Sequence, residues 1–155
     1  MDHAAELGKS SLFKELPAAE LEKLAGIAEE ITYNEGDLLV HEGDAPDKLL
    51  MIVMGSVSVT KQTPSGEDEQ LAVVGSGSYI GESAMVDQVA ERAITGRALE
   101  KTFVLAFSAE AMHALCEDNT ALGYHVYRAL ALGLAKRARG FARETAYYKS
   151  LSLHH

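Results

Sequence analysis

Residues 79–98 read Tyr-Ile-Gly-Glu-Ser-Ala-Met-Val-Asp-Gln-Val-Ala-Glu-Arg-Ala-Ile-Thr-Gly-Arg-Ala and combine a predicted helical turn with groups that can bind an anion. Gly81 precedes the turn, where the first backbone N–H groups have no partner within the helix and can bind an anion. Ten residues after Glu82, Arg92 can bind the same anion through its planar set of donors. Glu82 would repel an anion unless it accepts a hydrogen bond from a neighbouring hydroxyl. A ligand that carries a phosphate and a sugar hydroxyl would satisfy all three residues.

Glu82 and Arg92 also have a simpler interpretation. The two side chains could form an ion pair with each other across a β-bend, without any ligand. Binding would then replace one charge-assisted contact by another, so the net gain in affinity would be smaller than a count of contacts suggests. The residues alone leave both interpretations open.

Short apolar runs with a period of two lie on both sides of this stretch. Turns rich in Gly, Asp, Asn and Pro separate them, as in hairpins and bends. Strands this short and this regularly spaced predict an antiparallel barrel, roll or sandwich. The predicted strands cover residues 31–33, 38–41, 49–54, 57–61, 70–74 and 102–107.

Helical patterns flank the β-region. Pro17 suits the first position of a helix within the first helical region, and Ser108 can cap a helix over residues 109–117. A second, longer helix is predicted from about residue 120 to residue 148. Its apolar stripe could pack on the β-region or pair with a second copy of the chain.

These patterns predict one domain over residues 1–155, with no internal repeat or linker. Its fold class is mainly β with flanking helices: an antiparallel, jelly-roll-like β-roll with N-terminal helices and a long C-terminal helix. The helices are expected at about 7–30 and 109–149, and the β-roll at 31–108.

Composition is that of a soluble globular protein. The 155 residues are 47% apolar and 24% charged. No run approaches the roughly 18 consecutive apolar residues of a membrane span. The N-terminal residues lack the basic and apolar regions of a signal peptide. We therefore expect a cytoplasmic protein that has no membrane partner.

The cysteine content and the net charge argue against several kinds of site. The single cysteine, Cys116, excludes an internal disulfide and a four-cysteine metal site within one chain. The net charge of −9 argues against a broad nucleic-acid surface. A solvated helix face is the favoured interpretation of four basic residues near the C-terminus, with a phosphate-binding patch as the alternative. These residues are Lys136, Arg137, Arg139 and Arg143.

Metal binding and catalysis have little support in the residue pattern. His41 beside Glu42 suggests a metal site, but such a site needs two or three histidines, and the β-region contains one. Ser83 lacks the sequence context of a catalytic nucleophile. We therefore predict no catalytic residue, no metal and no cofactor.

The order of these features resembles the cyclic nucleotide-binding domain. That family includes the regulatory subunits of cyclic-AMP-dependent kinase, the bacterial catabolite activator protein and cyclic-nucleotide-gated channels. The resemblance runs from about residue 11 to about residue 134. It is carried by Ser11-Leu-Phe13 in the helical opening, by Glu42-Gly43-Asp44 and Met51-Ile-Val-Met-Gly55 in the roll, and by Gly77-Ser-Tyr-Ile-Gly81-Glu82-Ser-Ala84 at the start of the phosphate-binding cassette.

The resemblance implies roles for six residues of the cassette, residues 79–98. Glu82 is expected to accept a hydrogen bond from the ribose 2′-hydroxyl, and Arg92 to pair with the cyclic phosphate. Members that bind cyclic GMP commonly have Thr or Ser after the arginine, so Ala93 favours cyclic AMP, with cyclic GMP as the second choice. Backbone or small-side-chain contacts are implied for Gly81, Ser83, Ala84 and Ala93.

Three positions depart from the pattern of the family. Ile94 replaces a small residue and is expected to add bulk beside the ligand. Gly96 stands where a β-branched residue is usual, which is expected to loosen that strand. Glu91 precedes the arginine, where proline is frequent.

The resemblance implies a non-enzymatic sensor of cyclic nucleotide. The ligand would order the cassette, and the C-terminal helix would close over the base. Transcription-factor relatives continue from the long helix into a DNA-binding domain, for which there is no room after Lys149, so we expect an unknown effector protein and no nucleic acid. A homodimer through the C-terminal helix is also expected.

A second hypothesis belongs to another class. The chain could be a structural or interaction domain of the same fold that has lost nucleotide binding and dimerises or docks a partner through its C-terminal helix. An enzyme is a more distant alternative.

Overall fold

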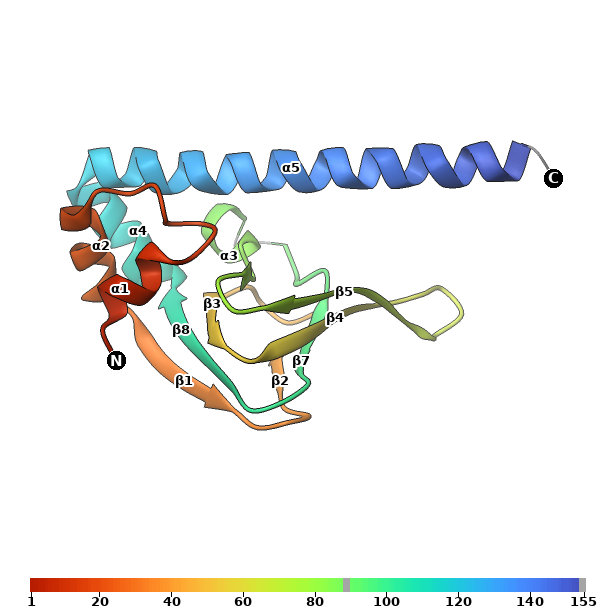
Figure 1. Ribbon diagram of the computed structural model, residues 1–155, viewed down its shortest axis with the longest axis horizontal. Coiled ribbons are helices and arrows are strands. Elements are labelled where there is room, and N and C mark those ends of the chain that lie inside the picture. The colour runs from red at the N-terminus through yellow and green to blue at the C-terminus, as the bar shows by residue number, and fades with distance from the viewer. Residues whose placement is uncertain (88–89, 154–155) are drawn as a thin grey trace.

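The computed structural model describes residues 1–87 and 90–153, and in these ranges two antiparallel sheets lie beside short helices and one long C-terminal helix (Figure 1). One sheet has the strand order β1-β8-β3-β6 and the other β2-β7-β4-β5. The predicted antiparallel β-roll with flanking helices is therefore confirmed. The helices are α1 (His3–Gly8), α2 (Ala18–Ala25), α3 (Ser83–Val86), α4 (Ala109–Asp118) and α5 (Thr120–Leu153). The strands are β1 (Glu29–Tyr33), β2 (Leu38–Val40), β3 (Lys48–Met54), β4 (Ser56–Gln62), β5 (Asp68–Gly75), β6 (Tyr79–Ile80), β7 (Thr95–Ala98) and β8 (Thr102–Ser108).

The N-terminal helices differ from the predicted range of 7–30. The first helix begins at His3, because Asp2 caps it by accepting a hydrogen bond from the N–H of Ala5 at 3.1 Å. The second is capped by Pro17, whose extended ψ of 151° places it just before the helix. Glu29 already belongs to β1, which pairs with β8, so sheet pairing overrides the local helical pattern there.

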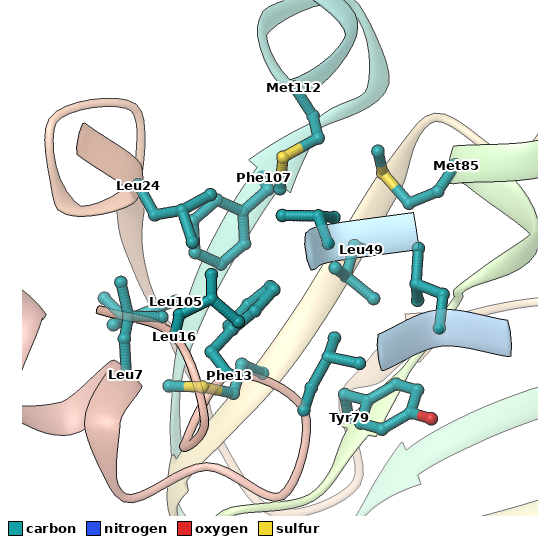
Figure 2. Packing of buried hydrophobic residues seen from close by; sticks show 14 of the residues in the cluster. Leu7, Phe13, Leu16, Leu24, Leu49, Tyr79, Met85, Leu105, Phe107 and Met112 are labelled. Carbon is teal, nitrogen blue, oxygen red and sulfur yellow. The ribbon is translucent and has the colours of Figure 1, made fainter. Parts of the chain in front are cut away.

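Strand β3 is buried on both faces of its sheet along most of its length. Along β3, Leu49 and Met51 face the cluster under the helices, whereas Leu50 and Ile52 face the cluster inside the roll. Figure 2 shows the first cluster, where the Phe13 and Phe107 rings meet edge to face with 5.9 Å between their centroids. This core joins the N-terminal segment, α4 and the first half of α5 to one sheet.

The strand β7 is tightly packed at its glycine. A Cβ at Gly96 would lie 3.1 to 3.3 Å from side-chain atoms of Ile80, Val40 and Val57, and Gly96 itself is buried. The glycine that was expected to loosen this strand thus lets two sheets approach closely.

The long helix α5 packs only along its first half. Leu122, Val126 and Leu130 are buried in the core, whereas residues 138–152 are exposed along their whole length. In Figure 1 this second half projects past the roll on the same side as the β4–β5 hairpin. No helix in the described ranges is apolar enough over its length to cross a membrane.

Candidate functional site

The cassette turns sharply at Gly81. Its φ of +82° lies in the left-handed region that favours glycine, and a Cβ there would lie 2.7 Å from the carbonyl oxygen of Lys48 and 2.8 Å from Nη1 of Arg92. Glu82 then precedes α3, as the predicted helical turn requires. The glycine therefore brings the backbone of the turn against the arginine.

The helix α3 is anchored to both C-terminal helices. Its residues Ala84 and Met85 are buried, and the carbonyl oxygen of Met85 lies 3.1 Å from His113 Nε2 and accepts a hydrogen bond from the Tyr127 hydroxyl at 3.0 Å. His113 belongs to α4 and Tyr127 to α5. A displacement of α3 would therefore act directly on both helices.

Arg92 is buried, with 7% of its surface exposed, and its guanidinium is held at the start of β3 by Asp47 and Lys48. Nη2 donates to Asp47 Oδ1 at 3.2 Å and to the carbonyl oxygen of Lys48 at 3.0 Å. Its backbone N–H donates to the carbonyl oxygen of Asp44 at 2.8 Å. Both its side chain and its main chain are thus fixed without a contact to Glu82.

Glu82 pairs instead with Arg137 of α5, whose Nη1 donates to Glu82 Oε1. The guanidinium carbon of Arg137 lies 4.6 Å from the centroid of the Tyr79 ring, and its Nη2 is 3.4 Å from the carbonyl oxygen of Tyr79. The ion pair between Glu82 and Arg92 is therefore a wrong interpretation of these two residues. Arg137 was wrongly assigned to a solvated helix face.

The surroundings of Tyr79 affect its acidity. Burial raises the pKa of the Tyr79 hydroxyl, Arg137 opposes this increase, and the carboxylate of Glu82 adds to it. The phenol is therefore neutral near pH 7 and presents a neutral ring face to the Arg137 guanidinium.

Two adjoining hollows lie between the cassette and α5. The smaller has a volume of about 240 Å³ and is lined by Gly81, Glu82, Ser83, Val86, Arg92, Ala93, Ile94 and Leu134. The larger, of about 490 Å³, shares four of these residues and adds apolar side chains from β4, β5, β6 and α5. Volumes of this order suit small ligands. The added apolar residues are Val59, Leu71, Ala72, Val74, Ile80, Ala138 and Phe141.

The structure brings five of the six predicted site residues to one hollow. Ala84 of α3 is the exception, because its side chain is buried and its N–H donates to the carbonyl oxygen of Gly81 at 3.1 Å. Ile94 lines both hollows and packs on the core inside the roll, so part of its bulk lies away from the space. The sequence reasoning missed Arg137 and Phe141, whose positions depend on how α5 crosses the roll.

A third hollow, of about 630 Å³, lies between residues 11–16 and α5. It shares only Tyr79 and Arg137 with the larger of the two hollows by the cassette, and no predicted site residue lines it. Within residues 1–87 and 90–153, no three His, Cys, Asp or Glu side chains are grouped so that they could hold a metal ion.

Comparison with curated proteins gives relatives that include a protein kinase and a receptor protein. The chain is 35% identical over 75 residues to a cGMP-dependent protein kinase of Drosophila melanogaster, a match that covers 48% of this chain and 8% of the kinase. It is 28% identical over 130 residues to the cyclic AMP receptor protein of Thermus thermophilus, which covers 84% of this chain and 58% of that protein. The chain thus spans only a small part of the kinase.

Among solved structures, the N-terminal domain of a transcriptional regulator from Streptomyces coelicolor superposes with a TM-score of 0.75 at 31% identity, over 84% of this chain and 93% of that domain. The family model of the cyclic nucleotide-binding domain matches residues 30–119, which include the roll, the cassette and α4. With its β-roll, its cassette and this match, the chain belongs to the cyclic nucleotide-binding domain family.

Proposed function

We propose that this protein is a non-enzymatic regulatory domain that binds cyclic AMP between the cassette and α5. The observation that carries the proposal is the hollow that gathers Gly81, Glu82, Ser83, Arg92 and Ala93. These residues offer an arginine, a carboxylate and small residues with an accessible backbone at one place. Such a set matches a ligand with one phosphate and one ribose hydroxyl.

Arg92 is suited to the phosphate because its charge is buried and incompletely neutralised. Its carboxylate partner, Asp47, has a side chain that is 70% exposed and bonds only to Nη2. The guanidinium has five donors, and the Nη1 group lies beside Gly81 at the hollow. A cyclic phosphate would complete the neutralisation of Arg92 with charge-assisted hydrogen bonds.

Glu82 is suited to the ribose even while Arg137 holds it. Arg137 bonds to Oε1, and a carboxylate can accept several hydrogen bonds through its two oxygens. A ribose hydroxyl could therefore donate to Glu82 without breaking the pair. In that arrangement Glu82 joins the ligand to α5.

The larger hollow is suited to the base. Its wall is apolar apart from Tyr79, Glu82 and Arg137, and Phe141 offers an aromatic ring at its α5 side. Guanine would bring more donors and acceptors into this apolar space than adenine, at the cost of their desolvation. Ala93 offers guanine no hydroxyl partner. These features favour cyclic AMP over cyclic GMP.

The response we propose is a shift in the position of α5. Leu134, Arg137 and Phe141 line the nucleotide hollow, while the exposed second half of the same helix is free to meet an effector protein. Ligand contacts with α5 would favour one helix position over others. The ligand would thereby change the surface that an effector protein meets.

A homodimer through α5 is part of the proposal. The exposed residues Ala131, Leu134, Ala138, Phe141, Thr145 and Tyr148 repeat at alternating spacings of three and four. This is the a/d pattern of a coiled coil, and its hydrophobic members form one stripe on the helix. Two copies could bury that stripe against each other.

Titration calorimetry with cyclic AMP, cyclic GMP and adenosine tests the proposed ligand. Wild type is expected to bind cyclic AMP, and cyclic GMP about tenfold more weakly. Arg92→Gln should weaken cyclic AMP binding by about a hundredfold and leave adenosine binding largely unchanged. Arg139→Gln, which changes an exposed arginine of α5, is the control and should behave as wild type.

The same titration separates the two hypotheses from the sequence. Folded, ligand-free wild type that binds neither cyclic nucleotide below about 1 mM would favour the interaction domain that has lost nucleotide binding. In that case cyclic AMP would also leave the melting temperature unchanged, whereas a binder at a hundredfold excess of ligand over Kd gains about 2.7 kcal/mol.

A further inference from the structure

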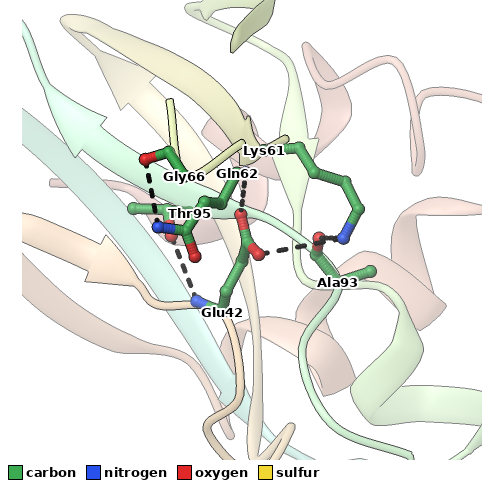
Figure 3. A network of polar contacts seen from close by, with 6 residues as sticks. All are labelled: Glu42, Lys61, Gln62, Gly66, Ala93 and Thr95. Atoms are coloured by element: carbon green, nitrogen blue, oxygen red, sulfur yellow. Dashed lines mark hydrogen bonds and ion pairs between the residues drawn. The ribbon is translucent and has the colours of Figure 1, made fainter. Parts of the chain in front are cut away.

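The carbonyl oxygen of Ala93 is held from outside the hollow by a lysine of β4. Figure 3 shows Lys61 Nζ donating to this oxygen at 2.9 Å. Lys61 follows Thr60, the last residue of β4 that pairs with β7, so it stands opposite the point where the cassette enters β7. It lines neither hollow beside the cassette.

Glu42 joins Lys61 to the rest of the cassette. Its Oε1 accepts a hydrogen bond from the N–H of Gln62 at 2.7 Å, and its Oε2 lies 3.8 Å from Lys61 Nζ (Figure 3). The N–H of Glu42 donates to Thr95 Oγ1 at 3.1 Å. Glu42 thus connects the 41–44 turn to the end of β4 through its carboxylate and to the start of β7 through its backbone N–H.

The 41–44 turn holds the peptide before Ala93. The N–H of Gly43 donates to the carbonyl oxygen of Arg92 at 3.0 Å. In a trans peptide the N–H and C=O point in opposite directions, so the N–H of Ala93 points away from this turn. Lys61 fixes the next peptide through its carbonyl oxygen, so both peptides that meet at Ala93 are restrained.

We propose that Lys61, oriented by Glu42, is a positioning residue that fixes the Ala93 backbone for the phosphate of the ligand. This inference rests on the proposed function, because Ala93 lines the hollow where the phosphate would lie. Lys61 acts through the backbone and touches no ligand. Restraint before binding raises affinity because less conformational entropy is lost when the ligand arrives.

The positioning role has two consequences that a merely stabilising contact would not have. Loss of Lys61 should weaken a ligand with a phosphate and spare one without it. It should also loosen the Ala93 backbone in protein without nucleotide, while the core sheet keeps its protection.

The experiment compares Lys61→Met, Lys61→Arg and Glu42→Gln with wild type. Lys61→Met should bind cyclic AMP about fivefold more weakly, as expected for an exposed charge-assisted hydrogen bond, and bind adenosine as wild type does. Lys61→Arg keeps a donor that reaches the carbonyl and should restore most of the affinity. Glu42→Gln should show a smaller loss in the same direction. Lys149→Met, on the projecting end of α5, is the control.

Amide hydrogen exchange without nucleotide tests the backbone role independently of the ligand. Lys61→Met should speed exchange severalfold at Gly43 and Arg92, whose N–H groups donate to the carbonyl oxygens of Arg92 and Asp44 beside Ala93, and leave β3 and β8 unchanged. Unchanged exchange at both amides would overturn the inference, as would equal weakening of cyclic AMP and adenosine. If wild type binds no cyclic nucleotide, the proposed function fails, and the exchange result alone decides whether Lys61 positions this backbone.

Discussion

Arg137 of α5 bonds to the carboxylate of Glu82 at the start of α3, although 55 positions separate the two residues in the chain. The pair ties the cassette to the helix that closes the hollow. The carboxylate expected to accept the ribose hydroxyl therefore already has a cationic partner before any ligand arrives.

A double-mutant cycle on Glu82→Gln and Arg137→Gln measures this pair. We expect a coupling free energy of about 0.5 to 1 kcal/mol in urea unfolding, because both side chains are partly exposed and water screens their charges. Arg137→Gln also loses the contact with the Tyr79 ring. This loss occurs in the single and in the double variant, so it cancels in the coupling free energy. A coupling indistinguishable from zero would mean that the pair does not fix α5.

Gly81→Ala should destabilise the protein and its cassette. A Cβ at Gly81 meets both a backbone oxygen and the Arg92 guanidinium, and the residue has positive φ. Gly66→Ala is the matched control, because its φ is +90° and a Cβ there meets nothing within 4 Å. We expect a loss of about 1 kcal/mol for Gly66→Ala and at least about 2 kcal/mol more for Gly81→Ala. Equal losses would show that backbone strain alone requires the glycine.

Two glycines of α5 should respond to alanine in opposite directions. A Cβ at Gly133 would collide with the Tyr79 hydroxyl, whereas a Cβ at Gly140 meets nothing within 4 Å. Gly140→Ala should raise helix content and stability by up to about 1 kcal/mol. Gly133→Ala should lower stability by about 1 kcal/mol, because overpacking exceeds the gain in helix propensity. Adding Tyr79→Phe, which removes the hydroxyl, should restore most of this loss.

Stability should fall at high pH, and Tyr79 should contribute. Its pKa in the folded protein is raised above the ordinary value, mainly by burial, so the folded state holds the proton more tightly than the unfolded state. The contribution is complete below the unfolded pKa of about 10 and is lost as pH rises through the folded pKa. Urea unfolding at pH 8 and pH 11 should show a smaller loss for Tyr79→Phe than for wild type. The difference in unfolding free energy between the two proteins at pH 8 measures the packing effect of the substitution and is subtracted. Equal losses of stability in both proteins between pH 8 and pH 11 would contradict the prediction.

The proposed coiled-coil stripe predicts that substitutions of the neighbouring Tyr147 and Tyr148 affect dimerisation differently. Tyr148 lies on the stripe and Tyr147 does not, yet the two are 60% and 61% exposed. Their rings contact each other with 5.7 Å between centroids, so replacement of either loses the same contact. In sedimentation velocity, Tyr148→Glu should shift the protein towards monomer by placing a charge in the interface, and Tyr147→Glu should sediment as wild type. If both variants sediment as wild type, the proposal that α5 forms the dimer interface is contradicted.

The order of elements could be predicted from local patterns. Strands with a period of two, glycine turns and the cap at Ser108 are short-range features, and the structure places the six predicted strands within a few residues of their predicted bounds. The short strands β6 and β7 were not among the predicted strands. The start of β1 could not be predicted, because Glu29 and Glu30 join the sheet only through pairing with β8. Local sequence does not contain that partner.

The cassette was predicted as a group, but its partners were not. Gly81, Glu82 and Arg92 lie within a short stretch whose spacing can be read directly. Asp47, just before β3, bonds to Arg92, and Arg137 of α5 bonds to Glu82. Their contacts depend on how distant elements pack, and an arginine on an exposed helix looks the same in sequence whether it meets water or a carboxylate. The close packing around Gly96 could not be predicted for the same reason, since the side chains that fill its space come from three other strands.

The straight, unsupported second half of α5 makes the helix a lever. From Leu134 at the nucleotide hollow to Leu153 the helix runs roughly 28 Å at about 1.5 Å per residue. A tilt of roughly 10° at the hollow would therefore move the far end by roughly 5 Å, about the pitch of one helical turn. A small adjustment around one bound nucleotide would then reach the end of the helix as a displacement large enough for another protein to distinguish.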